Sequence, residues 1–179
     1  ISHAYRLITD IEVNSSGAYI LERINTTQYT DKPIIYRMLK YDLNLDNQSW
    51  EIDLGENLFT GNGDFSLLSN GNIAIPRRAG TYDNTTFTWT MEIRDGSDGS
   101  LISSGSWWDS AERFVTGEIS SDSAGNFYVP LGHISERKRG YLVKFDSSGN
   151  PIHEKKLPPN LRVSDTSIKS NPEGTEQFI

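Results

Sequence analysis

Basic and aromatic residues gather in a few segments of an otherwise acidic chain, and they are of the types that bind anionic or sugar-like ligands. The chain has 17 Lys and Arg residues against 24 Asp and Glu residues, which gives a net charge of −7. Guanidinium groups bind anionic groups through paired hydrogen bonds, and aromatic faces attract cations. The alternative is that charged loop tips keep the surface soluble while a Trp packs between strands. We expect the ligand-binding residues to lie in loops that gather on one face: Arg77, Arg78, Trp107, Trp108, His133, Arg137, Lys138 and Arg139.

An acidic turn resembles part of a calcium-binding loop. Asp42, Asn44 and Asp46 offer side-chain oxygens at positions one, three and five, and Asp53 stands at position twelve. Position six is normally Gly but is Asn47 here. The alternative is a plain hairpin turn, because a comparable turn later in the chain lacks these ligands. Calcium is the one cofactor that the sequence suggests.

No catalytic motif can be recognised, so no catalytic residue is predicted. The chain lacks a Gly-x-Ser-x-Gly elbow, a phosphate-binding glycine loop and a His-Glu-x-x-His pair. His3, His133 and His153 do not have the spacing of metal ligands. His153 falls where an earlier segment has Trp50, which indicates a residue of a strand.

Composition excludes several classes of partner. There is no cysteine, so disulfides and thiolate sites are excluded. The acidic balance argues against nucleic acid, which requires a positive field. No apolar run is long enough for a membrane span. The chain starts at Ile1 without Met, and we expect it to be a piece of a longer protein.

A recurring pattern indicates how these residues are positioned. An apolar residue, five mostly polar residues and a glycine recur at intervals of roughly 50 residues, with the glycines at Gly17, Gly71, Gly125 and Gly174. Alternation of Phe87, Trp89, Met91 and Ile93 with polar residues is typical of a half-buried strand. Units of this size with four strands favour an all-β fold, a β-propeller, over a sandwich or a single barrel.

The propeller interpretation divides the chain into blades. The predicted segment covers 1–179, with four-stranded blades at about 5–57, 63–108 and 113–158 and the start of a fourth at 161–179. Three blades and a fragment cannot close a ring, because propellers have four to eight blades. We therefore expect a part of a six- to eight-bladed propeller, whose remaining blades lie on the same or another chain.

The stretches Ser121–Val129 and Gly140–Asn150 resemble bacterial propeller repeats of the SBBP, PQQ-like and NHL-like kinds. The resemblance implies a propeller on a secreted, periplasmic or cell-surface protein. These motifs specify a fold and not a function. From the basic and aromatic residues above and the lack of a catalytic motif, we expect a non-catalytic module that binds a protein or carbohydrate ligand through its loop-rich face. Two alternatives stay open: a propeller-fold hydrolase or lyase acting on polysaccharide, and a structural scaffold.

Overall fold

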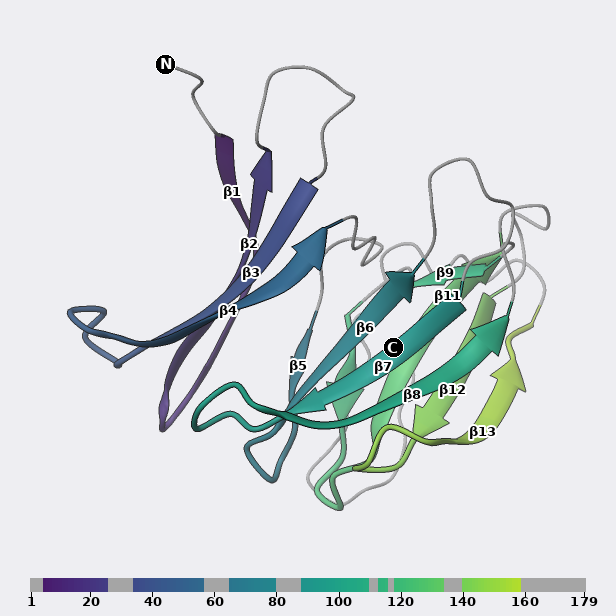
Figure 1. Ribbon diagram of the computed structural model, residues 1–179. Coiled ribbons are helices and arrows are strands. Elements are labelled where there is room, and N and C mark those ends of the chain that lie inside the picture. Colours follow the sequence, from purple (N-terminus) through teal and green to yellow (C-terminus); the bar gives the residue numbers. More distant parts are fainter. Residues whose placement is uncertain are drawn as a thin grey trace.

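The computed structural model describes residues 5–25, 34–56, 65–79, 88–109, 113–115, 118–133 and 140–158. Within these ranges every regular element is a β-strand, so no helix there is long and apolar enough to cross a membrane. The strands form three antiparallel sheets that follow one another along the chain (Figure 1). The prediction of an all-β fold with four strands to a sheet is confirmed for these ranges.

Each sheet contains a four-stranded meander in which each strand pairs with the next one. The first sheet contains β1 (Tyr5–Asn14), β2 (Gly17–Asn25), β3 (Ile34–Tyr41) and β4 (Gln48–Glu56). The second contains β5 (Ser66–Leu67), β6 (Ile73–Ala79), β7 (Thr88–Arg94) and β8 (Leu101–Asp109). The third contains β10 (Ser120–Ser121), β11 (Phe127–His133), β12 (Gly140–Phe145) and β13 (Pro151–Lys156), and β9 (Arg113–Val115) also pairs with β11.

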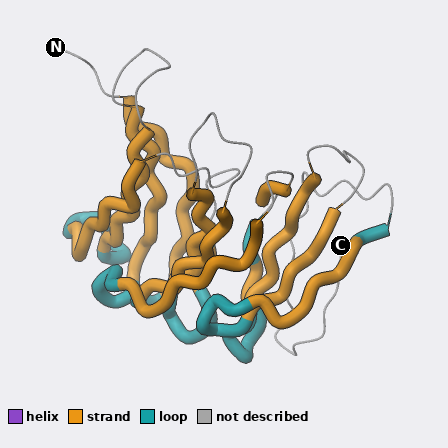
Figure 2. Tube along the Cα trace, turned by 45° about the vertical axis from the view of Figure 1, so that its right-hand side comes forward, coloured by secondary structure: helices purple, strands orange, loops and turns teal. Residues whose placement is uncertain are grey.

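The sheets stack face to face in chain order (Figure 2). Along each strand, side chains alternate between the two faces of the sheet. Between the first two sheets lies one core, which includes Tyr19, Leu21 and Met38 on one side and Ile73 and Ile75 on the other. Because each strand contributes every second residue to such a core, the alternating apolar pattern of the sequence is satisfied.

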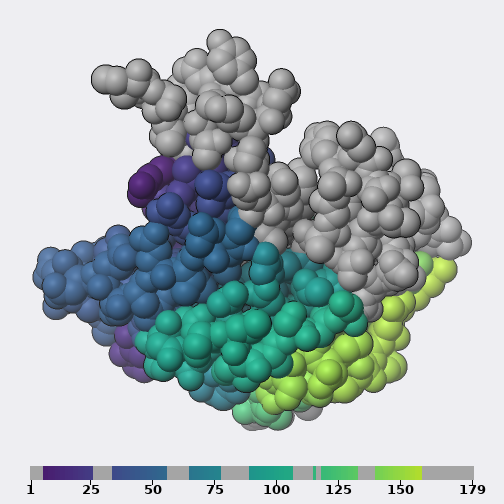
Figure 3. Space-filling model, viewed as in Figure 1, coloured from purple at the N-terminus to yellow at the C-terminus, as the bar shows by residue number. Residues whose placement is uncertain are grey.

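A second core fills the space between the second and third sheets. Trp89, Met91 and Ile93 of β7 meet Phe127 and Phe145, whose rings stack with centroids 5.0 Å apart. Alternate residues of β6 therefore belong to different cores, and the second sheet is covered on both faces. Figure 3 shows the sheets following one another across the surface, from blue through teal to yellow-green.

The glycine pattern does not mark equivalent positions in all three sheets. Gly71 and Gly125 lie in turns, whereas Gly17 lies in β2 and pairs with Asn14. A side chain at Gly17 would collide with the Tyr41 carbonyl oxygen. The turn between β1 and β2 is one residue shorter than the equivalent turns of the other two sheets. Alignment on the glycines therefore shifts the first sheet by one residue, which assigns each of its side chains to the wrong face.

Alignment on the central strand pairs restores equivalence. Ala18, Ile73 and Phe127 pair with Tyr41, Arg94 and Phe145, respectively, and an Asp follows each partner. These equivalent pairs of the second and third sheets face the preceding sheet. By the same register, Ala18 and Tyr41 lie on the outer face of the first sheet, opposite to the second sheet.

Candidate functional site

One side of the stack collects the ends of the central strands. In each sheet the second strand ends and the third begins on this side, at Asn25 and Ile34, at Ala79 and Thr88, and at His133 and Gly140 (Figure 1). The hairpin turns that join the first and second strands lie on the opposite side (Figure 2). We call the side on which the second strand ends and the third strand begins the loop side.

The predicted ligand-binding residues map onto strands more than onto loops. Arg77 and Arg78 belong to β6, and Trp107 and Trp108 belong to β8. His133 is the last residue of β11. The interpretation of these five as loop residues is therefore corrected, since the strands extend further than expected. The remaining three, Arg137, Lys138 and Arg139, lie outside the described residues.

The register brings two of the predicted residues to one row at the loop side. Arg78 pairs with Trp89, and Trp89 pairs with Trp108 on its other side. In the third sheet, His133 pairs with Arg113 of β9. The backbone thus brings Arg78 and Trp108 to the same level of the second sheet, on either side of buried Trp89.

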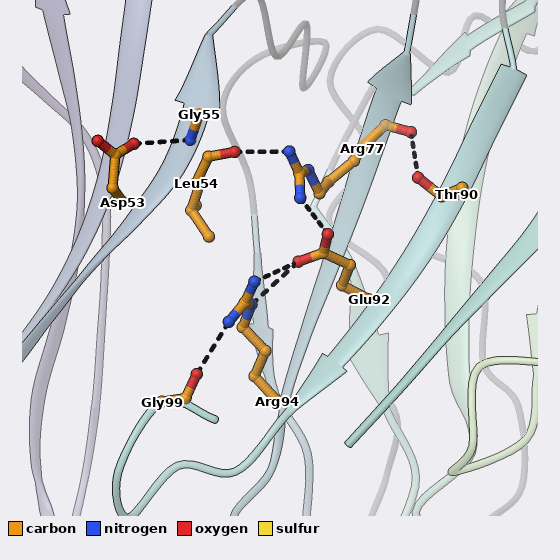
Figure 4. A network of polar contacts seen from close by, with 8 residues as sticks. All are labelled: Asp53, Leu54, Gly55, Arg77, Thr90, Glu92, Arg94 and Gly99. Carbon is orange, nitrogen blue, oxygen red and sulfur yellow. Dashed lines mark hydrogen bonds and ion pairs between the residues drawn. The ribbon is translucent and has the colours of Figure 1, made fainter. Parts of the chain in front are cut away.

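Arg77 is held between two sheets. One guanidinium nitrogen forms an ion pair with Glu92, and the other donates a hydrogen bond to the Leu54 carbonyl oxygen in β4 (Figure 4). Its side chain is 24% exposed. Because both of these nitrogens have protein partners, Arg77 links the first sheet to the second.

Glu92 is the centre of this network, and sequence reasoning missed it. Only 5% of Glu92 is exposed, and its Oε2 accepts a hydrogen bond of 2.9 Å from Arg94 Nε. Arg94 Nη1 also donates to the Gly99 carbonyl oxygen at 3.0 Å. The signal was present, because Glu92 and Arg94 are two residues apart in a strand whose other face is apolar, which places both charges on one covered face.

The four predicted calcium ligands do not come together. Asp42 Oδ1 accepts the Asp46 amide at 3.0 Å, and its Oδ2 accepts the Asn47 side-chain amide at 2.8 Å. Asp53 lies in β4 and pairs with Arg37 of β3. Arg37 precedes Asp42 by five residues, which at the usual rise of a strand puts Asp53 about 16 Å from Asp42. Asp53 Oδ1 accepts the Gly55 amide at 2.7 Å. Nowhere in the described ranges do three His, Cys, Asp or Glu side chains form a group that could hold a metal.

In each sheet an Asp begins the turn between the third and fourth strands (Asp42, Asp95 and Asp146), and this acid stabilises the turn. Asp146 Oδ1 accepts the amides of Ser148 and Asn150 at 3.0 and 2.8 Å, and Asp95 Oδ1 accepts the Ser97 amide at 2.7 Å. Burial raises the pKa of Asp146, but the hydrogen bonds from Asn150 and the turn amides outweigh it, so the pKa is below the ordinary 3.8. The hydrogen bond from Asn47 lowers the pKa of Asp42 in the same way. Such acids fix tight turns.

His153 has the position that the sequence indicated. It pairs with Lys144 in β12, just as Trp50 pairs with Lys40 in the first sheet. His153 is exposed in β13, so its interpretation as a strand residue is confirmed. The side chain of His133 and all of His3 lie outside the described part of the structure.

Comparison with known proteins adds no relative. No protein-family model matches the chain, and no curated protein matches it. The candidate site therefore depends on the residues themselves: the row Arg78, Trp89 and Trp108 at the loop side, beside an Arg–Glu–Arg network that joins two sheets.

Proposed function

We propose that the chain is a segment of an extracytoplasmic β-propeller with six to eight blades, and that it binds a protein or glycan ligand through its loop side without catalysing a reaction. Three four-stranded meanders stacked face to face in chain order support the propeller, because this is how consecutive blades are arranged. The extracytoplasmic location is supported by the resemblance of Ser121–Val129 and Gly140–Asn150 to bacterial propeller repeats.

The observation that carries the binding proposal is the common side of the strand ends. The segments 26–33, 80–87 and 134–139 each connect two strand ends on the loop side (Figure 1). The last of them contains Arg137, Lys138 and Arg139. Three consecutive cations in the sequence between His133 and Gly140, whose strand ends share the loop side with Arg78 and Trp108, favour a ligand with anionic groups on an aromatic or sugar-like frame.

The charged network argues for binding over catalysis at this place. A carboxyl group that acts as a general acid or base must be able to exchange a proton with the substrate. Glu92 is buried and is neutralised by Arg77 and Arg94. It therefore serves the joint between the sheets.

Affinity electrophoresis tests this proposal. The protein is run through native gels that contain polygalacturonate, an anionic polysaccharide, or dextran, a neutral one. We expect polygalacturonate to retard the protein, and the Arg137→Ala/Arg139→Ala variant to lose most of this retardation. The matched control is Ser123→Ala/Ser147→Ala, which changes two exposed turn residues on the opposite side. Equal retardation of both variants contradicts binding at the loop side.

A parallel assay addresses the hydrolase or lyase alternative. The same polysaccharides are incubated with the protein, and new reducing ends are measured over time. We expect no turnover. Sustained release of reducing ends would refute the non-catalytic proposal. If that release is then lost when the loop-side arginines are replaced and Glu92 is left intact, the reaction takes place at the loop side.

A further inference from the structure

The side chain of Asn70 folds back over the main chain in the turn between β5 and β6. Asn70 is exposed, and its Oδ1 accepts the Asn72 amide at 3.0 Å. This hydrogen bond closes a small ring around the Gly71 nitrogen. Only Cβ, Cα and the carbonyl carbon of Asn70 separate its side-chain Cγ from that nitrogen, so the ring holds the two atoms close together. Groups that are held in this way react with each other far more readily than free groups do.

The hydrogen bonds of the turn favour attack of the nitrogen on Cγ. The Asn72 amide donates to the oxygen that gains negative charge when a nucleophile adds to the Asn70 side chain, as the donors of an oxyanion hole do. The Gly71 N–H donates to the Leu68 carbonyl oxygen at 2.9 Å. This bond lies in the plane of the peptide group. A peptide nitrogen attacks through the orbital perpendicular to that plane, so the bond does not block the attack.

Gly71 leaves the attacking nitrogen unobstructed. Its φ is +86°, and a Cβ added to it would meet nothing within 4 Å. Glycine has no side chain to crowd its nitrogen, and the open space lets the turn adjust while a ring closes. The residue that follows Asn70 is therefore the one that hinders cyclisation least.

The turn between β1 and β2 has the same hydrogen bond without the glycine. Asn14 Oδ1 accepts the Ser16 amide at 2.8 Å and the Ser16 hydroxyl at 2.7 Å. The nitrogen inside that ring belongs to Ser15, whose side chain crowds it. Asn14 and Asn70 thus separate the effect of the glycine from that of the hydrogen bond.

A later turn has the glycine without the amide side chain. Asp98 Oδ1 accepts the Ser100 amide at 2.8 Å around the nitrogen of Gly99. A carboxylate is negatively charged and resists addition of a nucleophile, whereas a neutral side-chain amide does not. Within the described ranges, Asn70 is the one asparagine that glycine follows, and the chain's other Asn-Gly, at 62–63, lies outside them.

We infer that Asn70 and Gly71 form a site of spontaneous deamidation, at which the turn rearranges its own main chain. The Gly71 nitrogen gives its proton to hydroxide and forms a bond to Asn70 Cγ. The bond from Cγ to the side-chain nitrogen then breaks, and ammonia leaves with a proton taken from water. The product is a five-membered succinimide, and this step does not depend on the proposed ligand.

Water opens the succinimide in one of two ways. If the bond between the Gly71 nitrogen and Cγ breaks, the ordinary main chain returns with aspartate at position 70. If the bond between the same nitrogen and the former main-chain carbonyl carbon breaks, the chain continues through Cγ as isoaspartate. Both routes consume one water molecule and release one ammonia molecule, without oxidation or reduction.

Isoaspartate changes a turn that supports the core. Its main chain has one more carbon atom than that of asparagine. The turn is closed by the Leu68 amide, which donates to the Asn72 carbonyl oxygen at 2.8 Å. Leu68 is buried in the core between the second and third sheets. A longer turn cannot keep both of these positions, so isoaspartate loosens the packing of the second sheet on the third as the protein ages.

Peptide mapping of aged protein by mass spectrometry tests the inference. The folded chain is kept in mildly alkaline buffer made with heavy-oxygen water, and samples are digested over several weeks. We expect aspartate and isoaspartate with one heavy oxygen atom to form at position 70 about tenfold faster than at Asn14. The rate should rise with pH, because the Gly71 nitrogen must lose a proton. Asn70→Gln should abolish the change at this position and leave the rate at Asn14 unaltered. Equal rates at Asn70 and Asn14 overturn the inference.

The same experiment in concentrated urea shows whether the folded turn promotes the reaction. Unfolding removes the hydrogen bond from the Asn72 amide to Asn70. We therefore expect Asn70 to react no more slowly in the folded protein than in the unfolded one. Slower conversion in the folded protein would mean that the turn protects Asn70, and it overturns the inference.

Urea unfolding of fresh and aged samples tests the consequence for the joint. Aged wild type should unfold at a lower urea concentration than fresh wild type. Aged and fresh Asn70→Gln should unfold at the same concentration. Fresh Asn70→Asp should match fresh wild type, which separates the added charge from the rearranged main chain. If aged wild type contains isoaspartate at position 70 and unfolds as the fresh protein does, the rearranged turn does not loosen the joint.

Discussion

Replacement of Glu92 by Gln should destabilise the protein by removing the one negative charge that lies between two arginines. Glu92 is buried, and Arg77 and Arg94 bind its two oxygens (Figure 4). Gln preserves the shape of the side chain and one acceptor oxygen. It leaves two guanidinium groups facing each other, with side chains that are only 24% and 13% exposed.

Removal of one member of a buried ion pair costs about 3–5 kcal/mol. Water reaches part of Arg77, and Gln still accepts a hydrogen bond, so we expect a loss of about 2–3 kcal/mol in the free energy of unfolding. For a chain of this length each kcal/mol lowers the melting temperature by about 2–4 °C. The predicted decrease is therefore about 5–10 °C.

Urea unfolding followed by Trp fluorescence measures this loss. The matched control is Glu51→Gln, which breaks an ion pair to Arg37 at 2.7 Å whose side chains are 37% and 31% exposed. An exposed pair of this kind contributes at most about 1 kcal/mol. If Glu92→Gln costs no more than Glu51→Gln, burial of the network does not stabilise the joint between the sheets, and the reasoning is wrong.

Three further predictions follow from the turns. Gly99 has a φ of +78°, and a Cβ there would lie 2.9 Å from Ile52, whereas Gly71 has a φ of +86° and an added Cβ meets nothing within 4 Å. In urea unfolding, Gly99→Ala should therefore lower the free energy of unfolding by about 1–3 kcal/mol more than Gly71→Ala. Equal losses would refute the contact. Because the pKa of Asp146 is lowered, its carboxylate stabilises the fold above the ordinary pKa of 3.8, and this contribution is lost as the pH falls below it. The difference in free energy of unfolding between the wild type and Asp146→Asn should therefore shrink in unfolding curves taken below that pH. A constant difference would contradict this. Because Asp42 already accepts two hydrogen bonds in its turn, calcium or a chelator should leave the melting temperature unchanged in a thermal scan, and a calcium-dependent increase would restore the metal hypothesis.

The sequence was sufficient for the strands and their order. Alternation in β7, together with Asp, Asn, Ser and Gly at the turns, predicted hairpins, and hairpins joined in chain order make meanders. The equivalence of His153 and Trp50 also followed from the sequence. Each of these features depends on residues that are near one another in the chain, where periodicity is informative.

The contacts between sheets could not be predicted in the same way. The glycine pattern placed Gly17 with Gly71, and one residue of difference in turn length exchanged the faces of the first sheet. The ion pair of Arg77 with Glu92 and its hydrogen bond to Leu54 depend on how far β6 extends and on which sheet lies opposite. A basic residue near a predicted loop looks the same in sequence whether it meets a ligand or a buried glutamate.

The meander topology has a consequence for how the protein forms during synthesis. Every sheet is made from one unbroken stretch of chain, and its pairings join nearby residues such as Ala18 and Tyr41. The first sheet can therefore assemble on the ribosome before the second is made. At ordinary translation speeds the face that carries Tyr19 and Lys40 stays uncovered for about 3–10 s, until the hairpin that contains Gly96 has been synthesised. During that interval the nascent chain presents an adhesive apolar surface, which makes this stage the one at which a chaperone would protect it most.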